Sequence, residues 1–251
     1  MKLSIVDSPG SMAADVADRV KECLRFTSRP LFCPASGDTP AALYAELLRR
    51  AMDHTMNMRE WSFVGLDEWV GMNGEDAGSC RYYIDRGFFH PLNVPADRIC
   101  FFDGRAPDLQ KECADVERFI GRWGRIDVAI LGIGPNGHVA MNEPGSDPAG
   151  RSHVSELHPA TRETGQKYFS CHQTLERGIT LGLGTLMEAR HLFLLAIGEK
   201  KAEIIRKALE GPITTELPAS LLRNHPGLEV WLDAGAAGSL SVAVMQKDKP
   251  L

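Results

Sequence analysis

One segment of the chain brings together the residue types of an acid–base site. An apolar stretch that starts at Asp127 leads into the glycine turn Gly132-Ile-Gly-Pro-Asn-Gly137, and His138 and Glu143 follow. An imidazole flanked by an amide and a carboxylate can be oriented and tuned to transfer protons near neutral pH. Asn136, His138 and Glu143 are therefore candidate catalytic residues. Taken alone, a structural histidine is an equally good interpretation.

The same turn matches the G-x-G-x-x-G pattern of dinucleotide-binding proteins, and Glu156 lies at about the distance expected for a ribose ligand. That pattern needs a packed helix directly after the turn. Pro135 lies inside the loop, however, and Pro144 follows soon after Gly137. We therefore reject a dinucleotide site.

A second candidate is the small-residue loop from Ser36 to Thr39, which precedes a predicted helix. Free backbone N–H groups and the positive end of the helix dipole suit a phosphate, with the Ser36 and Thr39 hydroxyls as further donors. The carboxylate of Asp38 would repel a phosphate unless it points away. Without other evidence, an ordinary N-capped turn is the better interpretation of this loop.

Two more segments carry charges after predicted strands. Asp67 and Glu68 follow an apolar stretch, so one of them could accept a proton from carbon. For an isolated acid pair, a turn cap beside a solvated carboxylate is the better interpretation. Lys200 and Lys201 begin a helix, where cations oppose the dipole unless one of them meets an anion. Taken alone, they are surface charges.

Alternating strand and helix patterns predict how these segments meet. We expect strands at 30–35, 61–66, 126–133, 191–197 and 228–232, a helix with Thr39 as N-cap and Pro40 as its first residue, and a helix over 199–210 that ends at Gly211. Near-continuous apolar strands indicate a parallel sheet covered on both faces. The predicted fold is a single α/β domain over 1–251, with a doubly wound, Rossmann-like, mostly parallel sheet. Ligands bind at the carboxyl ends of such strands, where each candidate segment begins.

Composition narrows the function classes. A formal net charge of −5 argues against a nucleic-acid partner, and no apolar run is long enough to span a membrane. The six cysteines form no C-x-x-C pair and the N-terminus has no signal-peptide pattern, so we expect reduced thiols and a cytoplasmic protein. Histidines show no H-E-x-x-H or ligand-like spacing with cysteines, and no metal site is predicted.

Together, the motifs resemble the glucosamine-6-phosphate deaminase/isomerase family, which includes galactosamine-6-phosphate isomerases, in the 6-phosphogluconolactonase-like superfamily. The resemblance covers about residues 30–230 and rests on SGDTPAALY, FVGLDEWVG, LGIGPNGHVAMNEPG, GRSHVSEL, RGITLGLGTL, GEKKAEIIRKALEG and PASLL. 6-Phosphogluconolactonases look similar in the phosphate loop and the Gly-His turn, but they typically lack LDE(Y/W) followed by NEPG. A 6-phosphogluconolactonase is therefore the alternative function.

The resemblance implies a deaminase of the hydrolase class that converts a hexosamine 6-phosphate and water to a ketohexose 6-phosphate and ammonia, without metal or organic cofactor. Asp67 matches the carboxylate that moves the proton between C2 and C1. His138 matches the imidazole that assists ring opening, Glu143 the carboxylate that orients it, and Asn136 a position held by Asp or Asn. The implied phosphate-binding residues are Ser36, Gly37, Asp38, Thr39, Lys167 and Lys201.

Some positions depart from the family pattern. Asp38 replaces a common Gly or Ala, and Lys167 stands where many members have arginine, so it offers a point charge in place of a bidentate fork. Allosteric members carry basic residues where this chain has His153 and Ser155. We therefore expect no activation by an N-acetylated sugar phosphate, and both a monomer and a homo-oligomer stay open.

Three further expectations follow. The motifs give a slight preference for galactosamine 6-phosphate as substrate. The galactosamine branch is resembled more closely by LDEW, Gly78-Ser79-Cys80 and RGITLGL, whereas the non-allosteric glucosamine deaminases are also resembled by GRSHV and GIGxNGH.

The segment 146–167 is expected to be irregular and to act as a lid over the reactive intermediate. The chain from Ala236 to Leu251 is expected to be a loosely ordered tail. A silent sugar-phosphate binder, like the effector domains of some transcription regulators, is the remaining alternative.

Overall fold

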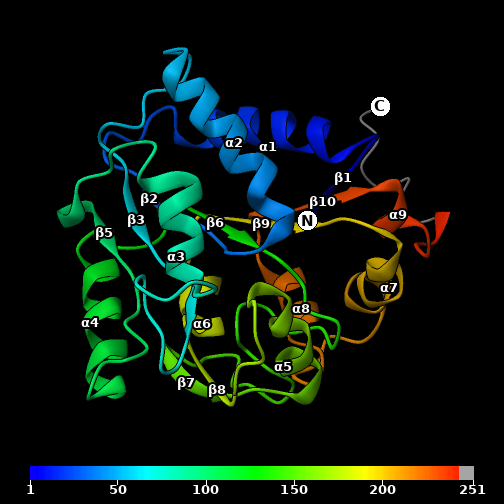
Figure 1. The fold of residues 1–251 in the computed structure, drawn as a ribbon. Helices are drawn as coiled ribbons and strands as arrows, with labels where there is room; N and C mark the ends of the chain where they lie inside the picture. Colours follow the sequence, from blue (N-terminus) through cyan, green and yellow to red (C-terminus); the bar gives the residue numbers. More distant parts are fainter. Residues whose placement is uncertain (243–251) are drawn as a thin grey trace.

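A seven-stranded sheet forms the centre of the protein in a computed structural model, in which residues 1–242 are described (Figure 1). The strand order is β1-β10-β9-β6-β2-β3-β5, and every neighbouring pair is parallel. The strands are β1 (Lys2–Val6), β2 (Leu31–Cys33), β3 (Ser62–Val64), β5 (Ile99–Cys100), β6 (Val128–Leu131), β9 (His191–Ala196) and β10 (Leu228–Asp233). The predicted parallel α/β sheet is therefore confirmed. β2, β3 and β6 are buried along their whole length, as expected for strands covered on both faces.

Helices cover both faces of this sheet, as right-handed crossovers between parallel strands require. On one face α1 (Pro9–Leu24) and α2 (Asp38–Met52) lie side by side (Figure 1), and Arg50 of α2 donates to Asp18 and to the Ala14 carbonyl of α1. The chain returns across the other face through α4 (Leu109–Gly121) and α7 (Ala202–Glu210). The shorter helices are α3 (Cys80–Ile84), α5 (Pro159–Gly165), α6 (Leu183–Met187), α8 (Pro218–Leu221) and α9 (Ala234–Ala237), with single helical turns at 85–89, 96–98, 166–168, 199–201 and 222–224.

A second, antiparallel sheet was not predicted. It consists of β4 (Asp67–Trp69), β8 (Arg177–Thr180) and β7 (His153–Glu156), in the order β4-β8-β7. Asp67 pairs with Thr180, so the acid pair lies in a strand of its own and not at the end of the predicted strand 61–66, which ends at Val64. Strands of three or four residues are too short to show a clear alternation of apolar and polar residues.

The expectation that 146–167 is irregular is wrong. The segment contains β7 and α5, and α5 starts with a proline at its first position after the N-cap residue His158. Its proline and glycine content is typical of loops, but here Pro159 marks a helix start. Whether this segment closes over a ligand as a lid stays a prediction.

Two predicted helix boundaries also change. α2 begins at Asp38, and its N-cap is Gly37 with φ of +113°, so Thr39 is not the cap and Pro40 is the third residue of the helix. A positive φ is available to glycine at no steric cost, which lets the helix start two residues earlier than predicted. The predicted helix 199–210 begins as a 3₁₀ turn over Glu199–Lys201 and ends at Gly211 as expected.

The predicted C-terminal tail is wrong at its start. α9 packs Ala236 and Ala237 into the core, and Leu240 is also buried. Residues 243–251 lie outside the described part of the chain. All six cysteines are within the described residues and none has a disulfide partner there. In residues 1–242, no helix is both long and apolar enough to cross a bilayer.

Candidate active site

A cavity of about 540 Å³ lies where β2, β6 and β9 end. Parallel strands end at the same edge of a sheet, and all four charged or glycine-rich segments reach this edge. The cavity is lined by eight of the ten predicted site residues: Ser36, Gly37, Asp38, Thr39, Asp67, His138, Lys167 and Lys201. A larger hollow of about 690 Å³ lies beside Trp61, at the start of β3, and none of the candidate residues, all of them within the described chain, lines it.

The other two predicted residues lie behind His138 and hold its ring. Nδ2 of Asn136 donates to Oε2 of Glu143 at 2.7 Å, and Oδ1 of Asn136 lies 2.7 Å from Nδ1 of His138. A carboxylate only accepts, so the amide must present its nitrogen to Glu143 and its oxygen to the ring. Nδ1 of His138 therefore carries the proton, and Nε2 keeps a free lone pair for the cavity.

Glu143 acts on the imidazole mainly through Asn136. Its Oε2 lies 3.6 Å from Nδ1 of His138, which is too far for a hydrogen bond. Its Oε1 accepts from the backbone N–H of His158 at 3.1 Å. The carboxylate thus joins the turn after β6 to the start of α5, and it orients the histidine through the intervening amide.

The ring of His138 lies directly over the backbone of Gly134. A Cβ atom at Gly134 would lie 2.1 Å from Cε1 of the imidazole, far inside van der Waals contact. The turn is closed by the N–H of Gly134, which donates to the carbonyl of His138, and by a positive φ at Gly137. The glycines of the G-x-G-x-x-G match therefore serve to fold the loop under the histidine and not to bind a dinucleotide.

The electrostatics of the site favour a neutral imidazole. Burial lowers the pKa of His138, Glu143 opposes this shift, and Lys201 adds to it. Thr161 of α5 places its hydroxyl 3.0 Å from Nδ1, so the ring proton has a second acceptor nearby. Thr161 was missed in the sequence because it lies in the segment interpreted as irregular.

Asp67 has the properties of a general base. Its side chain is almost completely buried, and burial raises the pKa of its carboxyl to about 6, while the Cys80 thiol beside it lowers the pKa. A carboxylate of this kind is ionised near neutral pH and is more basic than a solvated one. Cys80 is itself buried, and burial raises the pKa of its thiol well above the usual value. It serves as a packed hydrogen-bonding neighbour of Asp67.

The adjacent acid, Glu68, has a structural role. It is fully buried and accepts from the backbone N–H groups of Trp69, Cys80 and Arg81, each at 2.9 Å. Burial raises its pKa to about 7, and these hydrogen bonds oppose the shift. Glu68 therefore caps backbone N–H groups, as one interpretation of the acid pair expected. The same interpretation expected a solvated carboxylate beside it, but both Asp67 and Glu68 are buried.

The loop before α2 presents backbone donors to the cavity. Gly37 is the N-cap, and in the described chain no side chain caps this helix, so its first N–H groups stay available for an anion. Lys201 reaches the cavity from the loop after β9 and donates to the carbonyl of Ile133 at 2.6 Å. Burial and the nearby Lys167 lower the pKa of Lys201.

The carboxylate of Asp38 is paired with a lysine across the mouth of the same loop. Its Oδ2 accepts from Nζ of Lys167 at 2.6 Å, in an ion pair in which both side chains are largely exposed. The two residues that depart from the family pattern are therefore partners of each other. Tyr168, which was not predicted, places its hydroxyl next to Gly37, where a Cβ would lie 3.0 Å from it.

Comparisons with known proteins show which proteins this chain is similar to. The sequence profile of the family described as glucosamine-6-phosphate isomerases/6-phosphogluconolactonase matches residues 7–231. The chain is 38% identical to the glucosamine-6-phosphate deaminase of Bacillus velezensis over 81% of this chain and 85% of the relative. It is 36% identical to that of a Geobacillus species over 94% of both chains.

Solved structures show the same fold. A monomeric glucosamine-6-phosphate deaminase superposes with a TM-score of 0.91 at 30% identity, covering 95% of this chain and all of the other. A 6-phosphogluconolactonase from Leishmania guyanensis superposes with a TM-score of 0.77 at 20% identity, covering 96% of this chain and 99% of that one, and shares the fold.

The contact between Asn136 and His138 predicts how the imidazole titrates. Asn136→Asp adds a carboxylate beside Nδ1, so the pKa of His138 should rise by about one unit or more. NMR titration of the ring resonances measures this, with the distant and also buried His225 as internal control. An unchanged midpoint for His138 would contradict the arrangement of the three side chains.

Burial of Asp67 predicts a pH-dependent loss of stability. The pKa of Asp67 is about 6 in the folded protein, which is above its value in an unfolded chain. The protonated side chain therefore contributes its full stabilisation of the fold below pH 4, and this stabilisation is lost as pH rises through 6. Asn cannot ionise, so Asp67→Asn should not lose this stabilisation at neutral pH. The difference in free energy of unfolding between variant and parent should be larger at pH 7 than at pH 4, by up to about 3 kcal/mol in favour of the variant. Urea unfolding at both pH values tests this, with the exposed Asp97→Asn as control. An equal difference at both pH values would count against a buried, ionised Asp67.

Proposed function

The chain belongs to the family of glucosamine-6-phosphate isomerases and 6-phosphogluconolactonases, and from this we propose that it is a glucosamine-6-phosphate deaminase. One observation carries the proposal within this family. A buried carboxylate with a raised pKa, Asp67, faces the same cavity as a neutral imidazole, His138. Aldose–ketose conversion needs both a base for the C2 proton and an acid–base group at the ring oxygen. Hydrolysis of a lactone has no use for the first.

The phosphate of the substrate is proposed to bind at the loop 36–39. The N-terminus of α2 supplies backbone donors there, and Lys201 supplies a positive charge from the facing loop. Lys167 joins them once it leaves Asp38. Anchoring the phosphate fixes C1 and C2 of the sugar deeper in the cavity, and much of the catalytic effect of an enzyme comes from such positioning.

His138 is proposed to open the sugar ring. Nε2 takes the proton of the anomeric hydroxyl and returns it to the ring oxygen, which breaks the C1–O5 bond and leaves an aldehyde at C1. The hydrogen bond from Nδ1 to Asn136 keeps the ring in the tautomer that this step needs. Glu143 stabilises the imidazolium that forms during the transfer, through the same amide.

Asp67 is proposed to carry out the isomerisation. It removes the proton from C2 while one proton of the substrate's ammonium group moves to O1, which gives a neutral enolamine, and it then returns its proton to C1. The product is a protonated imine at C2, which water hydrolyses to the ketone and ammonium. The raised pKa of the Asp67 carboxyl reduces the pKa difference between this base and the C2–H bond of the substrate. General acid–base proton transfers of this kind accelerate a reaction roughly 10²–10⁴-fold.

Glucosamine 6-phosphate is the proposed substrate, although the motif resemblance slightly favours the galactosamine epimer. The proposal follows the relatives described above, which carry the glucosamine name. The preference for galactosamine 6-phosphate stays an untested prediction. Because the similar solved deaminase is described as monomeric, a monomer is the assembly proposed for this chain.

The decisive experiment compares ammonia release from glucosamine 6-phosphate and galactosamine 6-phosphate. The parent protein should release ammonia, faster from the glucosamine epimer, and Asp67→Asn and His138→Gln should each lower kcat by roughly 10²-fold or more. Asp97→Asn, on the surface, is the matched control and should keep full activity. Absence of ammonia together with hydrolysis of 6-phosphogluconolactone that survives Asp67→Asn would establish the lactonase alternative, and no turnover of either would indicate a silent binder.

The ion pair between Asp38 and Lys167 predicts an effect on substrate affinity. Asp38→Ala frees Lys167 and removes a negative charge near the phosphate loop, so KM should fall about two- to fivefold at low salt with little change in kcat. Lys167→Ala should raise KM. Steady-state kinetics at low and high ionic strength tests both changes. A KM that rises on Asp38→Ala would show that the carboxylate helps to bind the substrate.

A further inference from the structure

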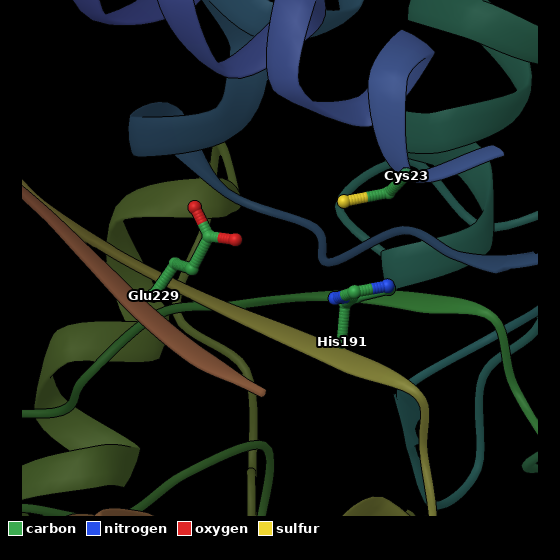
Figure 2. A group of neighbouring side chains, drawn as sticks. All are labelled: Cys23, His191 and Glu229. Carbon is green, nitrogen blue, oxygen red and sulfur yellow. The ribbon is translucent and has the colours of Figure 1, made fainter. Parts of the chain in front are cut away.

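Three potential metal ligands that are far apart in the sequence meet at the amino-terminal end of the main sheet. Cys23 lies in the last turn of α1, His191 is the first residue of β9, and Glu229 is the second residue of β10 (Figure 2). Their ligand atoms all lie within 4.8 Å of one another. β9 and β10 are neighbours, with Leu192 opposite Leu228, which places His191 and Glu229 on adjacent strands below α1.

One ligand atom of this cluster is left without a partner. Glu229 is only 5% exposed, and its Oε1 accepts from Nε of Arg19 at 2.7 Å. Its other oxygen, Oε2, is buried and has no hydrogen-bond partner among residues 1–242. A buried acceptor without a partner costs about 1–3 kcal/mol, so native structures rarely leave one empty. Within the same residues, no hydrogen bond engages either ring nitrogen of His191.

We propose that Cys23, His191 and Glu229 bind a divalent transition-metal ion of the zinc class. Thiolate, imidazole and carboxylate are the ligands that zinc accepts, and three of them leave a fourth position for water. Arg19 holds Oε1 of Glu229 and leaves Oε2 for the ion, which is how outer partners commonly orient a ligating carboxylate.

The surroundings set limits on the affinity. Burial raises the pKa of the Cys23 thiol to about 11, so the ion must displace a proton from sulfur. Burial lowers the pKa of His191, which keeps the imidazole in the neutral form that coordinates metals. The guanidinium of Arg19 adds a positive charge beside the site. Together these effects favour reversible binding over a permanently loaded structural ion.

The proposed site is separate from the catalytic cavity. Ile197, just past the end of β9, lines that cavity, whereas His191 begins the strand. At ~3.3 Å per residue along a strand, His191 and Ile197 lie roughly 20 Å apart. The ion would tie α1 to two central strands, so it should stabilise the fold without taking part in turnover. The expectation of no zinc site relied on spacing along the chain, which does not reveal ligands that only the sheet register brings together.

Cobalt(II) is the probe for the test, because a cobalt–thiolate bond absorbs in the near ultraviolet. Untagged, metal-free protein of full length should bind one cobalt ion per chain with this absorption, and zinc should displace it. Cys23→Ser should abolish the absorption. His191→Asn and Glu229→Gln should each weaken cobalt binding at least tenfold. The control is Cys171→Ser, which removes an exposed thiol next to His172 and should change nothing.

A second measurement keeps the test independent of any one variant. Zinc should raise the melting temperature of the parent and of Cys171→Ser, but not that of Cys23→Ser, whereas the hard cation magnesium should have no effect. Near-ultraviolet circular dichroism checks that each variant is folded. Loss of the cobalt absorption in Cys171→Ser, or its persistence in Cys23→Ser, would overturn the proposal, as would the absence of the absorption in the parent protein.

Discussion

The geometry of the active site depends most on the hydrogen bonds that the buried carboxylate of Glu68 accepts. This carboxylate gathers three backbone N–H groups, from its own strand and from the first turn of α3, around a single side chain. Successive residues of a strand face opposite sides, so this contact turns Asp67 the other way, toward the cavity. One acid of the pair is thus used to aim the other. The low polarity that surrounds both makes Asp67 more basic.

A second network connects parts of the site that are distant in sequence. The turn after β6 carries Asn136, His138 and Glu143, and the start of α5 carries His158 and Thr161, which contact that group. The orientation of the imidazole therefore depends on where the segment 146–167 lies. If this segment moves on binding a sugar phosphate, the contacts of His138 change with it, so substrate capture and proton transfer would be linked through Thr161 and Glu143.

The sequence predicts the main sheet and the residues of the cavity well, because both follow from local patterns. Apolar stretches mark the buried strands, and polar loops after parallel strands must meet at one edge. Three features escape such patterns. β4, β7 and β8 are too short for their periodicity to be read, and the start of α2 depends on a positive φ at Gly37. Which acid of Asp67-Glu68 faces the cavity depends on the pairing of β4 with β8, a contact between residues more than a hundred positions apart.

The position of β1 has a consequence for how the protein reaches this state. β1 is at the edge of the sheet and pairs only with β10 among the described residues, Lys2 opposite Glu229 and Val6 opposite Asp233. During synthesis β1 emerges more than two hundred residues before β10, so the two strands cannot pair until β10 has also left the ribosome. Contacts of such long sequence separation form late and slow the folding rate. Until then the buried side of β1 and the apolar face of α1 cannot pack against β10, and a chaperone could bind this exposed apolar surface during the interval.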